Sequence, residues 1–443
     1  MTNKIILSTI VDEGIARDHW SNIVPRFRDS SPWVRVNLPD DFIQMPINTV
    51  LDMDIEGFVI HQIGTNHSVD WWSGFTQVAY TDGIMHPNVV EMLPSKLMER
   101  LRNKSAIVHY DQSLEAFPLV STSINLYEPV TTSINLYEHF YSNFKKFDLP
   151  PEQFIYTTCN LLEEKVHATW CTENNIPENN RMIIVASNFF AAATQTPGFF
   201  NSDNDTITLA EHMEYKQNND ITLYNCLNRI IRGHRVALSA MLNYYNLIDG
   251  YKISHDIYPN HWSTNVNAAG FIDHPAFQSV NVTDIYSKLP LVLDTDQFQI
   301  NKAQHFFKDL YLQTYINVIT ETFCSEYQGE SMFFSEKIFK PIRARQPFIL
   351  VGAPGSIKAL RNLGFKTFDK WFDESYSDIE DNTSRIEAVC KLLLELNNKT
   401  KTEWLEMYNE MEDVLNHNYD VLMQTHWTQK LRTILHDRIP HGL

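Results

Sequence analysis

Three arginines, Arg229, Arg232 and Arg235, stand between a predicted strand at residues 221–226 and a helical run at residues 236–247. The N–H groups and the dipole at the start of a helix favour anions, and guanidinium groups beside them add bidentate contacts to phosphate. This turn therefore fits the diphosphate of a nucleotide ligand. Taken alone, the three residues fit a solvated basic turn equally well.

A second charged segment carries Glu336, Lys337 and Lys340 at the start of a predicted helix. The apolar runs at residues 315–319 and 347–351 on either side have the composition of buried strands. A carboxylate at this place can accept hydrogen bonds from both hydroxyls of a ribose, and Lys337, with Lys340 or Arg343 one turn on, can neutralise a diphosphate. A Glu-Lys pair is common on surface helices. The combination is more specific, because a parallel sheet brings this segment and the arginine turn to the same edge.

Two carboxylates in the first half of the chain are candidates for a general base. Asp111 and Glu115 follow a predicted strand at residues 106–110, where a carboxylate can take the proton of an acceptor hydroxyl. For each residue alone, helix capping by Asp111 and a solvated Glu115 is the commoner interpretation.

Predicted strands alternate with predicted helices along most of the chain, which favours an α/β fold with parallel sheets. We expect two Rossmann-like domains, at residues 1–215 and 216–400, and a helical tail at residues 401–443. The strands of the first domain are expected at residues 5–10, 58–64, 106–110, 154–158 and 182–186. Those of the second are expected at residues 221–226, 315–319, 347–351 and 365–368.

Composition narrows the class of protein. The 443 residues include 43% apolar residues, which indicates a globular protein with an apolar core. The formal charge of −18 argues against a broad nucleic-acid-binding face, since such a face needs clustered Lys and Arg. The five cysteines show no CxxC spacing, so we expect thiols in a reducing compartment and no structural zinc. No apolar stretch approaches the length of a membrane span, and we expect a cytoplasmic protein.

A seven-residue sequence occurs twice, at residues 122–128 and 132–138. Two copies do not make a solenoid, which needs at least three stacked units. We expect this duplication to be a tolerated insertion in a surface loop.

The segments at residues 225–235, 335–339 and 346–352 resemble the nucleotide-sugar half of GT-B glycosyltransferases. The pattern is most similar to that of the α1,3-fucosyltransferases, and it also resembles glycosyltransferases carried by bacteriophages. Ser335 stands where the fucosyltransferases usually have Thr, and the segment around Pro341 replaces their Asn-Ala-Leu-like run. These departures leave the donor open, as GDP-fucose or another nucleotide sugar.

The resemblance implies a GT-B-like arrangement, in which two Rossmann-like domains face a central cleft and a terminal helix crosses back to the first domain. It implies that Arg229 or Arg235 holds the donor diphosphate, that Glu336 binds the ribose and that Lys337 binds a phosphate. It also implies that no metal is required; Asp52-Met53-Asp54 matches a DxD motif by letters but precedes a predicted strand of the acceptor half.

The leading hypothesis is a glycosyltransferase that moves a sugar from a nucleotide-diphosphate donor to a hydroxyl acceptor such as a glycan. Its assigned donor residues are Arg229, Arg232, Arg235, Glu336, Lys337 and Lys340, and it needs no cofactor besides the donor. Two alternatives stay open: transfer to modified nucleic acid bases, and a non-catalytic carbohydrate-binding protein on a transferase scaffold.

Overall fold

The structure is a computed structural model. It describes residues 5–9, 42–46, 59–64, 90, 93, 95–112, 120–124, 131–195, 206–228, 232–255, 274–278, 284–285, 287–289, 291, 293, 306–322, 324 and 331–438. The chain divides into two compact units. Unit 1 contains Met1–Ser123, Thr132–Ala192 and His426–Leu443, and unit 2 contains Ile124–Thr131 and Ala193–Thr425.

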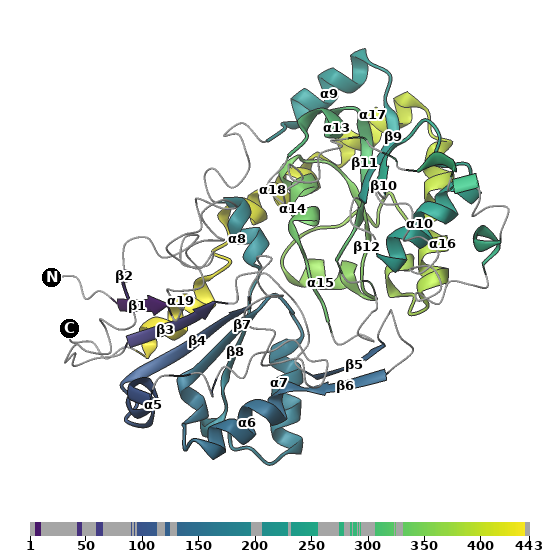
Figure 1. Cartoon of the computed structure of the whole chain (residues 1–443). Coiled ribbons are helices and arrows are strands. Elements are labelled where there is room, and N and C mark those ends of the chain that lie inside the picture. The colour runs from purple at the N-terminus through teal and green to yellow at the C-terminus, as the bar shows by residue number, and fades with distance from the viewer. Residues whose placement is uncertain are drawn as a thin grey trace. The chain divides into compact units, whose positions relative to one another are not determined.

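Unit 1 is built on a parallel sheet with strand order β2-β1-β3-β4-β7-β8 (Figure 1). Its strands are β1 (Ile5–Thr9), β2 (Phe42–Pro46), β3 (Val59–Gly64), β4 (Ala106–Gln112), β7 (Phe154–Thr158) and β8 (Ile183–Ala186). All five residues of β7 are buried, as expected for an inner strand covered on both faces. A separate two-stranded sheet pairs β5 (Val120–Ile124) with β6 (Thr131–Asn135).

The helices of unit 1 are α5 (Ser95–Arg102), α6 (Leu136–Lys146), α7 (Glu163–Glu173) and α19 (Gln429–Asp437), and α8 (Phe189–Gln195) crosses into unit 2. The C-terminal helix α19 is tied to this unit by an ion pair between Lys430 and Glu164 and by Arg438, which donates to the carbonyl of Glu152. Leu431 and Leu435 of α19 are buried.

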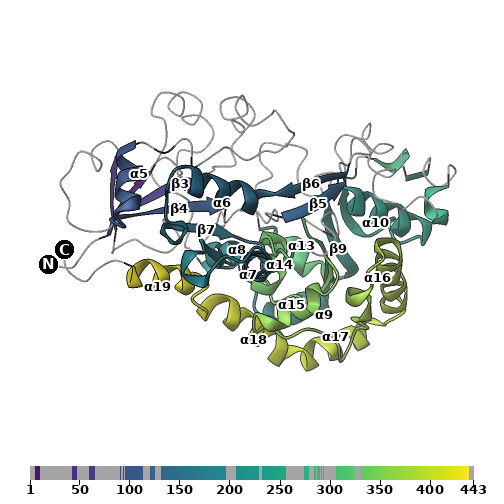
Figure 2. The same cartoon turned by 90° about the horizontal axis from the view of Figure 1, so that it is seen from below.

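Unit 2 contains a parallel sheet with strand order β10-β9-β11-β12. The strands are β9 (Thr222–Asn228), β10 (Lys252–His255), β11 (Thr314–Thr320) and β12 (Phe348–Val351). β11 and β12 are buried along their whole length. Figure 1 and Figure 2 show α10 (Gly233–Tyr244) and α16 (Asn382–Asn397) on one face of this sheet, with α14 (Glu336–Arg343) and α18 (Glu412–Gln424) on the other.

In the described part of unit 2 the other α-helices are α9 (Leu209–Asn218), α13 (Lys308–Leu312), α15 (Ser356–Asn362) and α17 (Lys401–Glu410). Several begin where the sequence supplies a capping side chain. Thr208 with Glu211 and Thr400 with Glu403 form capping boxes at α9 and α17, and Ser335 caps α14 through the N–H of Lys337.

The prediction of an α/β protein with two Rossmann-like units and parallel sheets is confirmed. The predicted strand at residues 365–368 is wrong, because this segment pairs with no strand. Asn418 of α18 takes the place of a strand partner: its amide accepts from the N–H of Lys366 and donates to the carbonyl of Lys366, at 2.8 Å in each case. Phe365 and Phe368 are nevertheless core residues.

The duplicated sequence is not a surface insertion in both of its copies. In the second copy, Asn135 caps α6 by accepting from the N–H of Glu138, and Leu136 and Tyr137 are buried. Tyr137 also donates to the buried carboxylate of Glu163. Leu136 and Tyr137 of the second copy therefore belong to the core of unit 1. In the first copy, residues 125–128 lie outside the described part of the chain.

The units divide between Ala192 and Ala193, whereas the sequence placed a boundary at residues 215/216. Helix α9 belongs to unit 2 because the ring N–H of His212 donates to the carbonyl of Ala344 (2.7 Å) and Lys216 donates to that of Thr314 (2.8 Å). Of the tail expected at residues 401–443, α17 and α18 lie in unit 2, and only His426–Leu443 belongs to unit 1.

Candidate functional site

The carboxyl ends of the four parallel strands of unit 2 meet at one edge of the sheet. In open α/β sheets this edge is where ligands bind. The last residues of the strands are Asn228, His255, Thr320 and Val351, and Glu321 directly follows β11. Helices α10 and α14 both begin near this edge, because each follows one of the central strands.

The arginine turn supplies the start of α10. Arg232 is the N-cap residue and is half-buried, whereas Arg235 in the first turn is only 3% exposed. The guanidinium of Arg235 donates to the carbonyls of Thr320 (3.2 Å) and Glu321 (3.3 Å). Arg235 thus ties α10 to the end of β11. Arg229 lies outside the described residues.

The electrostatics of Arg235 show which charges surround it. Burial lowers its pKa to about 10, and the nearby Arg232 acts in the same direction. The carboxylates of Glu321 and Glu336 oppose this shift. The charge of Glu336 therefore favours the ionised form of Arg235, as expected for two motifs at the same sheet edge.

Glu321 connects the end of β11 to the start of α14. Its carboxylate accepts from the Ser335 N–H (3.2 Å to each oxygen) and from the Ser335 hydroxyl (2.6 Å). Both residues are 1% exposed. Burial raises the pKa of Glu321 above its ordinary value, and the charge of Glu336 adds to the effect, against the opposing influence of Lys337 and Ser335.

The first turn of α14 presents Glu336 and Lys337. The Lys337 ammonium lies 3.1 Å from the Glu336 carboxylate and 3.1 Å from the Ser335 hydroxyl. Burial opposes ionisation of Glu336, but the charges of Lys337 and Lys340 outweigh it and hold the pKa of Glu336 below its ordinary value. The site thus pairs an ionised carboxylate, Glu336, with a neighbouring carboxyl, Glu321, whose pKa moves the other way.

Sequence reasoning missed Glu321 and His234. Glu321 is the residue directly after a buried strand, so the rule that singled out Asp111 would also have found it. His234 shares a hydrogen bond of 2.9 Å with the Glu321 carbonyl. It is hard to recognise from sequence because its partner is a backbone atom 87 residues away.

The predicted base residues belong to unit 1. Asp111 is the penultimate residue of β4 and pairs with Thr157 of β7 at the carboxyl end of that sheet. The structure describes the backbone of Asp111, and Glu115 lies outside the described residues.

Within the described part of the chain, no group of three or more His, Cys, Asp or Glu side chains could hold a metal ion. In the same part, no helix has the length and apolar character to cross a membrane.

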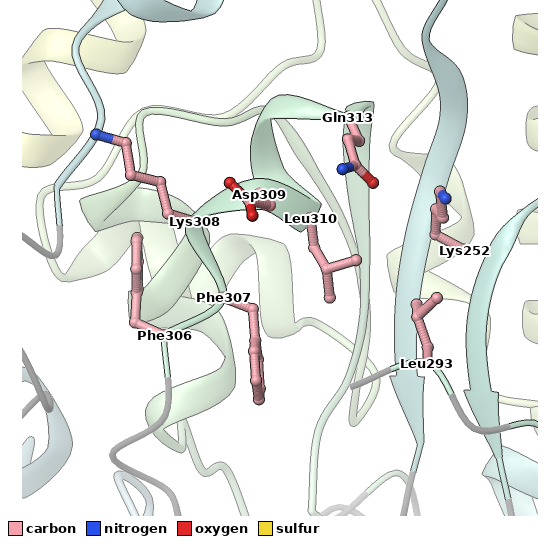
Figure 3. A pocket seen from close by; sticks show the side chains of 8 residues that line it. All are labelled: Lys252, Leu293, Phe306, Phe307, Lys308, Asp309, Leu310 and Gln313. Atoms are coloured by element: carbon pink, nitrogen blue, oxygen red, sulfur yellow. The ribbon is translucent and has the colours of Figure 1, made fainter. Parts of the chain in front are cut away.

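A cavity of about 510 Å³ lies elsewhere in unit 2, near the amino ends of β10 and β11. Figure 3 shows Lys252 and Leu293 on one side of it and α13 residues such as Leu310 on the other. Lys308, which also lines this cavity, pairs with Glu211 at 2.7 Å. Because Lys252 begins β10 and Gln313 precedes β11, the cavity is at the opposite edge of the sheet from Arg232, Arg235, Glu336 and Lys337. We therefore do not assign the cavity to the donor.

No protein-family model and no curated protein matches this chain. Several solved structures have a similar chain trace. The trehalose-6-phosphate structure from E. coli bound with UDP-2-fluoro glucose is 12% identical, with 86% of this chain and 74% of that chain covered and a TM-score of 0.39. The N-terminal domain of trehalose-6-phosphate phosphatase from Candida albicans is 11% identical, with 99% and 97% covered and a TM-score of 0.41. A glycosyltransferase from Rickettsia africae is 11% identical, with 99% of both chains covered and a TM-score of 0.39. At this level of similarity, substrate and reaction have to be argued from the residues of this chain.

Proposed function

We propose that this protein is a glycosyltransferase that binds a nucleotide-diphosphate sugar at the carboxyl edge of the unit 2 sheet and transfers the sugar to a hydroxyl acceptor. One observation carries the proposal. Two charged motifs about 100 residues apart in sequence, Arg232–Arg235 and Glu336–Lys337, start helices at the same sheet edge, and both Arg235 and the cap residue Ser335 bond to Glu321 at the end of β11. This combination of helix starts, cations and one ionised carboxylate fits a nucleoside diphosphate.

Each residue has a role that follows from its exposure and partners. Lys337, 27% exposed, and Lys340 are the cations of α14 that can reach a diphosphate. Glu336 is kept ionised and can accept from both ribose hydroxyls. Arg232 is the better phosphate ligand of the arginine turn, since the guanidinium of Arg235 is turned onto backbone carbonyls.

The chemical step follows from these roles. The acceptor oxygen forms a bond to the anomeric carbon, while the bond between that carbon and the diphosphate oxygen breaks and its electron pair leaves with the nucleoside diphosphate. Lys337 and Arg232 stabilise the charge that develops on the leaving diphosphate. We assign the acceptor's proton to a carboxylate of unit 1, Asp111 or Glu115. With cations of the chain in these positions, the reaction needs no metal ion.

Thermal melting with a panel of UDP, GDP, ADP, CDP and TDP tests donor binding. Selective stabilisation by one of them is expected, because a ligand that binds only the folded state raises its melting temperature. Glu336→Ala and Lys337→Ala should remove that shift. Lys308→Ala is the matched control: it is also a partly exposed lysine paired with a glutamate, but it lies at the opposite edge of the sheet. Loss of the shift in all three variants, or in none, contradicts the assignment.

Measured turnover of nucleotide sugars distinguishes a glycosyltransferase acting on glycans from a carbohydrate-binding protein and from a base-modifying enzyme. Release of the nucleoside diphosphate from the matching nucleotide sugar, with EDTA present, is expected of a metal-independent transferase. GDP-fucose and UDP-hexoses distinguish fucosyl from hexosyl transfer. Binding without release over long incubation with glycan acceptors identifies a carbohydrate-binding protein instead, and transfer restricted to modified DNA identifies a base-modifying enzyme.

A further inference from the structure

We propose that Glu321 is a positioning residue, which fixes the ammonium group of Lys337 through the hydroxyl of Ser335. The inference rests on the proposed donor site and adds a residue that does not itself touch the donor. Glu321 is 1% exposed, so its carboxylate acts on a ligand through its neighbours.

The direction of the Ser335 hydroxyl is set by Glu321. A serine hydroxyl has one proton to donate and two lone pairs with which to accept. The Ser335 hydroxyl donates to the Glu321 carboxylate at 2.6 Å, and an ionised carboxylate can only accept. The Ser335 N–H donates to the same carboxylate and fixes the backbone of the cap residue.

The lone pairs of the Ser335 oxygen are thereby left for Lys337. The Lys337 ammonium lies 3.1 Å from this oxygen and 3.1 Å from the Glu336 carboxylate. Two acceptors hold a long, flexible side chain that otherwise has several rotamers, and ordering such a side chain before binding lowers the entropy that the ligand must offset. The chain of contacts runs from Glu321 to Ser335 to Lys337.

Hydrogen bonds to neighbouring segments fix the backbone of Glu321. Its N–H donates to the carbonyl of Val351 at 2.9 Å, and its carbonyl is shared by His234 and Arg235. Strand β12 and helix α10 therefore both hold the backbone of the residue from which Ser335 and Lys337 take their positions. A substitution that keeps the volume of Glu321 should leave this frame in place.

A double-mutant cycle on nucleoside diphosphate binding tests the proposal. UDP and GDP are each titrated by calorimetry into the wild type, Glu321→Gln, Lys337→Ala and the double variant. Glu321→Gln is expected to weaken binding about tenfold when Lys337 is present and less than about twofold when it is absent, because coupled residues are non-additive. An equal loss in both backgrounds overturns the proposal while leaving the donor site intact.

Crystal structures of ligand-free variants give a readout that does not depend on nucleotide binding. In Glu321→Gln the Lys337 ammonium is expected to leave Ser335, and an unchanged contact overturns the proposal.

Ser335→Ala gives the second test if Glu321→Gln does not yield folded protein. Ser335→Ala should lower nucleotide affinity as Glu321→Gln does. Ser335→Thr should restore the affinity because the hydroxyl is retained. If wild type binds none of UDP, GDP, ADP, CDP and TDP, the proposed donor site fails, and the crystal structures still decide whether Glu321 orders Lys337.

Discussion

The guanidinium of Arg235, in the first turn of α10, donates a hydrogen bond of 3.2 Å to the carbonyl of Thr320, the last residue of β11. This bond joins two segments that are 85 residues apart in sequence. It also distinguishes the roles of two arginines in one turn, since Arg232 is half-buried and Arg235 is fully buried.

Arg235→Met should lower stability, and Arg232→Met should lower nucleotide affinity. Removal of the Arg235 guanidinium takes this donor from the carbonyl of Thr320 at the end of β11, which costs about 1–3 kcal/mol. Arg232→Met should leave the melting temperature nearly unchanged. Thermal melting and nucleotide titration on both variants make the comparison, and a reversed pattern contradicts the assigned roles.

Glu321→Gln should change how stability depends on pH. Burial raises the folded-state pKa of Glu321 above its ordinary value of 4.5, so between the unfolded-state and folded-state pKa values the folded protein holds a proton that the unfolded chain has released. The stabilisation is complete below the unfolded-state pKa and is lost as pH rises through the folded-state pKa. Melting temperatures of both proteins from about pH 4 to about pH 8 check this. The wild type should lose stability relative to Glu321→Gln as pH rises, and parallel curves contradict it.

Lys216→Met should destabilise unit 2. The Lys216 ammonium is fully buried and donates to the carbonyls of Leu312 (3.0 Å) and Thr314 (2.8 Å). Relief of the burial of a cation favours the variant, but the carbonyls left without their donor cost about 1–3 kcal/mol, and we expect this cost to prevail. Lys308→Met, which breaks the partly exposed pair with Glu211, should cost less than about 1 kcal/mol. Urea unfolding compares the free energies of unfolding of the two variants, and equal values would contradict the prediction.

Leu435→Ala should destabilise unit 1, because α19 buries this side chain. Truncation of a buried leucine costs about 2–5 kcal/mol. Thr433→Ala, at an exposed position of the same helix, is the control. Calorimetric melting should show a lower transition temperature for Leu435→Ala alone. Identical melting of both variants means that α19 does not contribute to the core of unit 1.

Much of the fold could be predicted because the central strands carry unbroken apolar runs. β7 and β12 appear at or within a residue of their predicted limits, since runs such as Phe348–Val351 are buried on both faces. β2, β5, β6 and β10 were missed. β10 is four residues long and begins with Lys252. The segment at residues 365–368 has strand composition, but a side chain from a helix 52 residues away satisfies its backbone.

The charged motifs of the candidate site could be predicted from the sequence, but the hydrogen bonds that join them could not. The sequence indicated that Arg235 and Glu336 lie at one edge, because each follows a strand of a parallel sheet. It could not show that Arg235 bonds to backbone carbonyls or that Ser335 is held by Glu321, since both contacts depend on how α10 and α14 pack against β11.

Calorimetric titration of the nucleoside diphosphate selected by the melting panel tests the donor site most directly, in wild type, Lys337→Ala and Lys308→Ala. Lys337→Ala is expected to weaken binding by about tenfold or more, as for the loss of a charged phosphate contact, and Lys308→Ala should bind as wild type does. Equal affinity in wild type and Lys337→Ala would contradict a donor site at this edge of the sheet.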